Sequence, residues 1–173
     1  MIRVLSIILA TLLSCYVLVV AFFFRDVKED GLCEGMEIVL RDSLEKHFVT
    51  DGDLVYLLKQ AKLYPVKTPM NEINTEEIEE KLLSNNMISK VEAYKTPSRL
   101  IKLEIEQKMP ILRVNSPAGN YYVDNLGSMM PLSRHYVAHV LVASGQIDEK
   151  LALGDLYKFA LFLEEDDFWN DWI

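Results

Sequence analysis

The chain has 173 residues and a formal net charge of −8 at pH 7. This length allows one ordinary domain or two small ones, and it excludes a large multidomain enzyme. The 18 Lys and Arg residues are outnumbered by 26 Asp and Glu residues and form no cluster, which excludes the phosphate-neutralising surface of a nucleic-acid-binding protein.

The first predicted element is a membrane-spanning helix at residues 4–24, "VLSIILATLLSCYVLVVAFFF", which contains no charged residue, Pro or Gly. Such a helix is about 30 Å long, which matches the hydrocarbon core of a bilayer. Two alternatives remain open: a cleaved signal peptide, whose apolar core is normally shorter, and a lipoprotein cleavage box at residues 12–15. We expect a retained single-pass anchor, with residues 1–3 in the cytoplasm and the rest of the chain outside.

Residues 25–34 are polar and are expected to form a linker, followed by a half-buried strand at Met36–Asp42. The linker contains Cys33, whereas Cys15 lies inside the apolar run. Two cysteines do not make a framework of structural disulfides. Cys33 is expected to be an ordinary small residue at the entrance of the domain, with an intermolecular disulfide as the alternative.

Two capped helices are predicted next. In "FVTDGDLVYLLKQA", Thr50 is the expected N-cap, Asp53 its reciprocal partner, and Val49 is expected to contact Leu54. The second helix repeats this pattern, with cap, partner and apolar pair at Asn74, Glu77, Ile73 and Ile78. The apolar stripes are Leu54, Leu57, Leu58 and Ala61 in the first helix and Ile78, Leu82 and Leu83 in the second. Residues 64–70, "YPVKTPM", contain two prolines and are expected to connect the helices.

Two alternating stretches follow, residues 88–96 and residues 100–108, and both predict strands. The second, "LIKLEIEQK", places Ile101, Leu103 and Ile105 on one face and charged residues on the other. The order strand, helix, helix, strand, strand predicts an α+β fold in which two helices cover one sheet.

After Pro110 the sequence predicts shorter strands with turns, in "ILRV", "NSPAGN", "YYVD", "NLGSMMP" and "YVAHVLVAS", and therefore a second, β-rich domain at residues 110–173. One helix is expected at about residues 149–163, with its apolar residues at Leu151, Leu156, Phe159, Ala160 and Leu163. Four of the last six residues are apolar, and from them we expect the second domain to continue beyond residue 173: Phe168, Trp169, Trp172 and Ile173.

The sequence contains no motif for catalysis or metal binding. His135 and His139 have the spacing of two zinc ligands on a helix, but "HYVAHVLV" indicates a strand and no Glu follows His135. "TDGD" fits a helix cap better than a calcium loop. Four carboxylates are expected on a solvated helix face rather than in an acid–base pair: Glu76, Glu77, Glu79 and Glu80. The methionines of "SMMP" are expected in a loop or the core rather than on a soft contact surface. We therefore predict a protein that is not an enzyme and uses no cofactor, metal or small-molecule substrate.

The apolar N-terminal run is followed in order by "GMEIVLRDSLEKHFVTDGDL", "INTEEIEEKLLSNNMISKVEAYKT", "LEIEQKMPILRV" and "YYVDNLGSMMPLS". This arrangement, over nearly the whole chain, resembles the FtsQ/DivIB family of bacterial cell-division proteins. The resemblance implies a POTRA domain at residues 35–109 and the start of the family's β domain after it. The chain has Asn86 where similar members usually have Pro, which should change only a turn.

The resemblance also implies a function. The family is a non-enzymatic scaffold outside the cytoplasmic membrane, at the division septum, where it binds the bitopic proteins FtsB and FtsL and helps to recruit septal peptidoglycan synthesis. The family's FtsB-binding strand would lie beyond Ile173, so no partner-binding residue is assigned. The alternative is a POTRA-type chaperone or accessory protein of envelope transport or outer-membrane assembly. A membrane-bound hydrolase would rest on scattered carboxylates alone.

Overall fold

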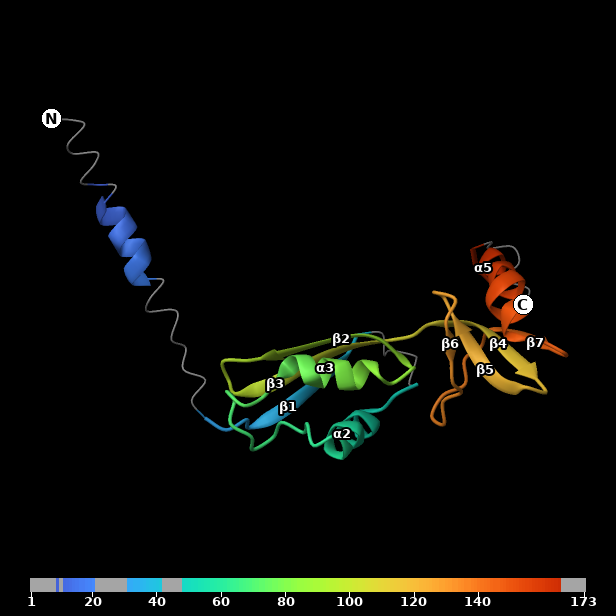
Figure 1. Ribbon diagram of the computed structural model, residues 1–173, viewed down its shortest axis with the longest axis horizontal. Coiled ribbons are helices and arrows are strands. Elements are labelled where there is room, and N and C mark those ends of the chain that lie inside the picture. The colour runs from blue at the N-terminus through green and yellow to red at the C-terminus, as the bar shows by residue number, and fades with distance from the viewer. Residues whose placement is uncertain (1–8, 10, 21–30, 42–47, 166–173) are drawn as a thin grey trace. The chain divides into compact units, whose positions relative to one another are not determined.

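The computed structural model describes residues 9, 11–20, 31–41 and 48–165, and it divides into two compact units, Met1–Gly31 and Leu32–Ile173 (Figure 1). Residues 11–20 form a helix within the predicted span 4–24; the other residues of that prediction, apart from Leu9, lie outside the described part. The apolar side chains of this helix are exposed, among them Leu12 at 64% and Leu18 at 68%. Within the described residues, no helix has both the length and the apolar character needed to cross a membrane.

The second unit begins with a three-stranded sheet. Its strands are β1 (Gly35–Leu40), β2 (Ile88–Lys95) and β3 (Leu100–Gln107), in the spatial order β1-β3-β2. β1 runs parallel to β3, and β2 runs antiparallel to it. Helices α2 (Asp51–Gln60) and α3 (Thr75–Leu83) lie between β1 and β2 in the sequence. The predicted order of elements is confirmed, although β1 ends before the predicted limit at residue 42.

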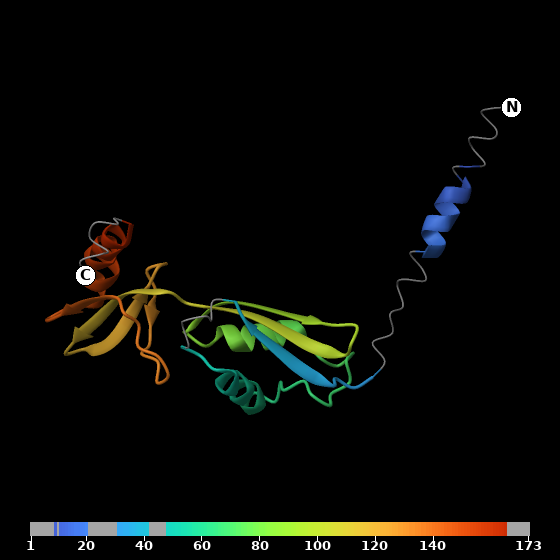
Figure 2. The same cartoon turned by 180° about the vertical axis from the view of Figure 1, so that it is seen from behind.

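Both helices contribute to one core with this sheet. α3 lies in front of the sheet in Figure 1 and behind it in Figure 2, so it covers one face. The predicted apolar face of β3 is confirmed, since Ile101, Leu103 and Ile105 are 0% exposed. The same core cluster contains two buried leucines or isoleucines from each helix: Leu54 and Leu58 from α2, and Ile78 and Leu82 from α3.

The helix caps follow the prediction in α2 and depart from it in α3. The Thr50 side chain accepts from the Asp53 N–H, and the Asp53 carboxylate accepts from the Thr50 N–H at 2.9 Å, which is the predicted reciprocal cap. Asn74 accepts from two backbone N–H groups as predicted, but the Glu77 carboxylate accepts from the Asn74 side-chain amide at 2.9 Å. Asn has a side-chain amide that can donate a hydrogen bond, and this amide bonds the Glu77 carboxylate in place of the backbone N–H of Asn74.

One member of the predicted apolar stripes is wrong. Leu83 is 44% exposed, whereas Leu82 is 0% exposed. Adjacent helix residues point about 100° apart, so Leu83 points away from the direction in which Leu82 enters the core.

A four-stranded sheet follows, formed by β4 (Pro110–Ser116), β5 (Gly119–Asp124), β6 (Met129–Met130) and β7 (Leu141–Ser144), in the order β6-β5-β4-β7. β4 and β5 form an antiparallel hairpin, and β7 runs parallel to β4. The predicted strand in "YVAHVLVAS" is therefore wrong for residues 136–140. Instead, Tyr136, Ala138 and Val140 pack against the core of the first sheet, and the Ala138 N–H donates to the Tyr122 hydroxyl.

The predicted helix near residues 149–163 is present as a continuous helical stretch with a π-helical segment, α4 (Glu149–Leu151), η1 (Ala152–Leu156) and α5 (Tyr157–Glu165). The Asp148 side chain caps its N-terminus. Ala160 and Leu163 are buried, but Leu151 and Phe159 are 39% and 52% exposed. A π segment shifts the helical phase, which takes later residues off a stripe counted at 3.6 residues per turn. The four apolar residues expected at the chain end lie outside the described residues.

Candidate interaction surfaces

A sheet edge carries backbone N–H and C=O groups that an added strand can pair with, so the edges of the two sheets are the first candidate surfaces. The first sheet has edges at β1 and β2, and the second at β6 and β7. These edges differ in whether other groups of the protein hydrogen-bond to their outward backbone groups.

The β2 edge is closed by a side chain from α3. The Glu79 carboxylate accepts from the Ala93 N–H at 2.7 Å, and the register of β2 against β3 shifts between Ile88 and Lys90. Capping groups and irregularities of this kind stop a further strand from pairing. The sequence placed Glu79 on a solvated face with Glu76, Glu77 and Glu80; it is only half-buried, but it has a specific structural role that sequence spacing did not reveal.

Among the described residues, no side chain caps the β1 edge, and no hydrogen bond is recorded at its outward N–H groups, those of Met36 and Ile38. The register of β1 against β3 is continuous from Gly35 to Leu40. β1 is thus a regular and open edge.

In the second sheet, β6 has only two residues, and β7 has four. Val142 of β7 is 54% exposed and lies opposite Arg113 of β4. Met130 of β6 is fully buried, and Met129 is 40% exposed. The core alternative for "SMMP" therefore holds for Met130.

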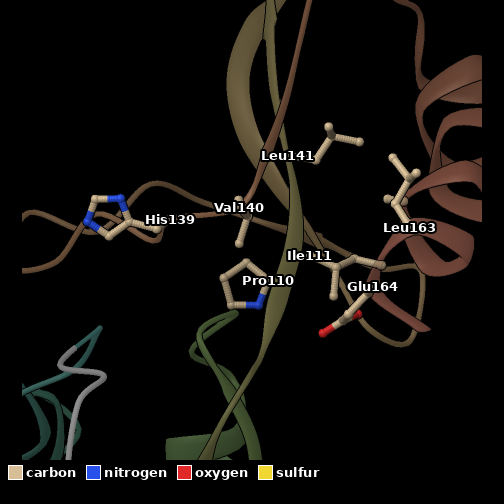
Figure 3. A pocket seen from close by; sticks show the side chains of 8 residues that line it. Pro110, Ile111, His139, Val140, Leu141, Leu163 and Glu164 are labelled. Carbon is tan, nitrogen blue, oxygen red and sulfur yellow. The ribbon is translucent and has the colours of Figure 1, made fainter. Parts of the chain in front are cut away.

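A pocket of about 330 Å³ lies beside the start of β7 and α5 (Figure 3). Ile111, Leu141 and Leu163 give it apolar walls, and Glu164 is the only carboxylate among its lining residues. The His139 ring lies well apart from the Glu164 carboxylate in Figure 3, so these two groups form no acid–base pair. Among its described lining residues the pocket thus contains no paired acid and base.

The two histidines predicted as structural or surface residues are separated. His139 lines the pocket, whereas His135 Nε2 lies 3.2 Å from Asp53 Oδ2 at the start of α2. No group of three or more His, Cys, Asp or Glu side chains that could hold a metal is found among the described residues. The Thr50 hydroxyl is the largest cause of the lowered pKa of Asp53, and His135 adds to it. The acid in "TDGD" is therefore a cap, as predicted.

Cys33 is 1% exposed, and its thiol donates to the Gly35 carbonyl at 3.1 Å. This burial agrees with the expectation of an ordinary small residue at the start of the domain, and it hides the sulfur from a second chain.

The face of the first sheet opposite the helices carries an ion-pair network. The Glu104 carboxylate accepts from the Tyr94 hydroxyl at 2.6 Å and from the Arg41 guanidinium. The Tyr94 hydroxyl, followed by Arg41, lowers the pKa of Glu104 to about 2. Lys90 and Glu92 form a neighbouring pair at 2.6 Å. The opposite charges of these residues therefore compensate one another.

Aromatic rings join the first sheet's core to the second sheet. Phe48 packs edge-on against Tyr136, with ring centroids 4.9 Å apart, and against Tyr122 at 6.2 Å. The Ser133 hydroxyl donates to the Phe48 carbonyl at 2.8 Å. Residues 131–140, between β6 and β7, therefore have a packing role. The sheet edges remain the candidate binding sites.

Comparison with known proteins gives two matches along the chain. Residues 31–106 match a family model described as a POTRA-like domain. Residues 109–173 match one described as FtsQ/DivIB, C-terminal related. A search of curated proteins found no match. The first match covers the three-stranded sheet with α2 and α3, and the second covers the four-stranded sheet and the helical stretch after it.

Proposed function

Because the chain belongs to the FtsQ/DivIB family of cell-division proteins, we propose that it is a membrane-anchored scaffold that binds FtsB- and FtsL-like proteins outside the cytoplasmic membrane. Through them it helps to recruit septal peptidoglycan synthesis. The family match to residues 109–173 is the observation that carries this proposal, since POTRA-like domains also occur in other envelope systems.

The proposed anchor is the helix at residues 4–24. The exposed leucines of residues 11–20 support it, because a helix that shows apolar side chains to its surroundings needs lipid or protein to cover them. With residues 1–3 in the cytoplasm, the linker 25–34, the POTRA domain 35–109 and the β region from residue 110 would lie outside. An anchor confines partners to the membrane plane and raises their effective concentration.

Open sheet edges supply a physical means of recruitment. Main-chain hydrogen bonds to an added strand give affinity, and side chains beside the strand give selectivity. The uncapped edge at β1 and the short edge at β7 support this mode of binding. The mode needs no catalytic group, cofactor or metal.

The test uses the full chain in lipid nanodiscs with purified FtsB- and FtsL-like proteins from the same cell. We expect saturable binding to the nanodiscs and a fluorescent fusion that concentrates at the septum. Depletion of the protein should block septation. Normal division in a clean deletion strain would refute the proposal.

The alternative function, an accessory protein of envelope transport or outer-membrane assembly, is favoured only by the POTRA-like match. It predicts even fluorescence around the whole envelope and a transport defect without filamentation. The same fusion and deletion strains therefore separate the two functions.

A further inference from the structure

We propose that the outer edge of β1 binds an extended segment of a partner protein, one with apolar side chains at alternate positions and a Lys or Arg beside Glu37. This inference rests on the proposed scaffold function and assigns one binding surface to it. The partner would add a fourth strand to the first sheet next to β1.

The direction of the backbone groups can be followed along the strand. The Cys33 N–H donates away from β3, to the Thr68 carbonyl at 2.9 Å, and the next N–H, that of Glu34, donates to Arg99 O beside β3 at 2.9 Å. Successive N–H groups of a strand alternate between its two edges. The alternation shifts by one residue where β1 begins, because the Arg41 N–H after β1 also donates to β3, to the Ile105 carbonyl at 3.0 Å. Counting back from Arg41, the N–H groups of Val39 and Glu37 face β3. Those of Met36 and Ile38 point outward, where no acceptor is recorded among the described residues.

The protein already uses the beginning of this edge for strand pairing. Lys67 N–H donates to the Cys33 carbonyl at 2.8 Å, and Leu32 forms an antiparallel bridge with Pro69. Lys67 has φ of 71°, a left-handed conformation that turns the chain and ends the pairing after one step. Beyond Gly35, the outward N–H groups of Met36 and Ile38 lie on the same edge, and no partner for them is recorded among the described residues.

Side-chain burial shows that the helix-facing side of β1 is incompletely covered. Met36, Ile38 and Leu40 lie opposite Ile101, Leu103 and Ile105 of β3. The three β3 residues are 0% exposed, whereas their three β1 neighbours are only half-buried although they pack against the same core. Apolar side chains of an added strand would cover this remaining surface, which explains the alternate apolar positions in the proposed partner.

Charge identifies the residue expected on the other side of the partner. Glu37 is the only charged residue of β1, it is exposed, and no ion pair is recorded for it among the described residues. A Lys or Arg beside it would form a cross-strand pair. A second copy of this chain fits less well, because it would add another acidic edge from a chain of net charge −8.

β1 also lacks the features that protect natural edge strands. It contains no Lys, Pro or register shift, whereas the opposite edge has the Glu79 cap and a shift between Ile88 and Lys90. The difference between the two edges points to binding at β1 and not at β2.

The test measures amide hydrogen exchange by NMR in the full chain in nanodiscs, with the capped peptide Thr-Val-Lys-Val-Thr as the probe. In the free chain, the Met36 and Ile38 amides should exchange at least about tenfold faster than those of Glu37 and Val39. Saturating peptide should slow the first two amides about tenfold or more. Ile38→Pro, which removes an outward N–H without a bond to β3, should abolish this protection. Ile38→Val, which keeps the N–H, should retain it.

A charge reversal gives a second test that does not depend on the fold of the proline variant. Wild type should bind the Lys peptide more tightly than Thr-Val-Glu-Val-Thr, and Glu37→Lys should reverse this preference. Equal protection of all four amides in the free chain, peptide binding to Ile38→Pro, or peptide shifts at Val142 instead of β1 would each overturn the inference. These measurements use no division protein, so failure of FtsB- and FtsL-like proteins to bind would refute the proposed function separately.

Discussion

The closed β2 edge gives a direct test of how the structure assigns a role to one acidic residue. Glu79→Ala removes the carboxylate that accepts from the Ala93 N–H at 2.7 Å. The bond is partly buried and has a charged acceptor, and a hydrogen bond to a charged group contributes about 1.5–3 kcal/mol. We expect the Glu79→Ala chain to be less stable than wild type by about this amount, because the Ala93 N–H is left without its acceptor.

The Ala93 amide is expected to lose protection from hydrogen exchange before other amides do. A change of about 1.5–3 kcal/mol corresponds to an increase of about 10- to 100-fold in exchange at Ala93. Glu79→Gln, which retains a neutral acceptor, should lose less, about 0.5–1.5 kcal/mol. The matched control is Glu80→Ala, one position along α3 on an exposed residue, which should change stability by less than about 0.5 kcal/mol.

Amide exchange by NMR and urea unfolding measure these effects on the full chain in nanodiscs. The reasoning fails if the Ala93 amide exchanges at the same rate in Glu79→Ala and in wild type. It also fails if Glu80→Ala accelerates Ala93 exchange as much, since the effect would then come from charge or helix propensity and not from the cap.

Phe48→Ala removes a 1% exposed ring from between Tyr122 and Tyr136 and should lower the urea midpoint by an amount equivalent to about 3–5 kcal/mol, against less than about 0.5 kcal/mol for the exposed Phe159→Ala. The Glu104 carboxyl has its folded-state pKa lowered from 4.5 to about 2 by Tyr94 and then Arg41, so its stabilising effect is present above pH 4.5 and is lost as pH falls from about 4.5 to about 2. Acid unfolding of Glu104→Gln should lack that part of the pH dependence, and identical profiles would contradict it. Gly127 has φ of 75° and an added Cβ would lie 3.3 Å from the Tyr157 ring, so Gly127→Ala should destabilise the chain by about 1 kcal/mol or more. Gly154→Ala, at a helical position with nothing within 4 Å, should stabilise it by about 0.5–1 kcal/mol, and thermal unfolding compares the two.

The sequence predicted the first sheet and its helices because their signals are local. Alternation in residues 100–108 needs only the strand itself, and the Thr50–Asp53 cap spans three residues. Residues 136–140 show the limit of such signals. Their apolar alternation is real, but Tyr136, Ala138 and Val140 use it to pack on the first sheet's core, more than thirty residues away in sequence.

The β1 edge could not be predicted as a binding site, because its exposure depends on contacts between segments that are distant in sequence. The sequence does not reveal the different roles of Glu37 and Glu79. Glu37 is a single acid among apolar residues, and Glu79 belongs to an acidic run. Their difference depends on sheet order, since β3 takes the centre and leaves β1 and β2 as edges. It also depends on α3, which places the Glu79 carboxylate on the Ala93 N–H.

This topology explains why the two edges differ. α3 ends at Leu83 and β2 begins at Ile88, so a short turn keeps the helix beside the strand that its carboxylate caps. Under the proposed function, an anchor at residues 4–24 would confine this protein and its anchored partners to one membrane plane, which raises the effective concentration of a partner segment at the β1 edge.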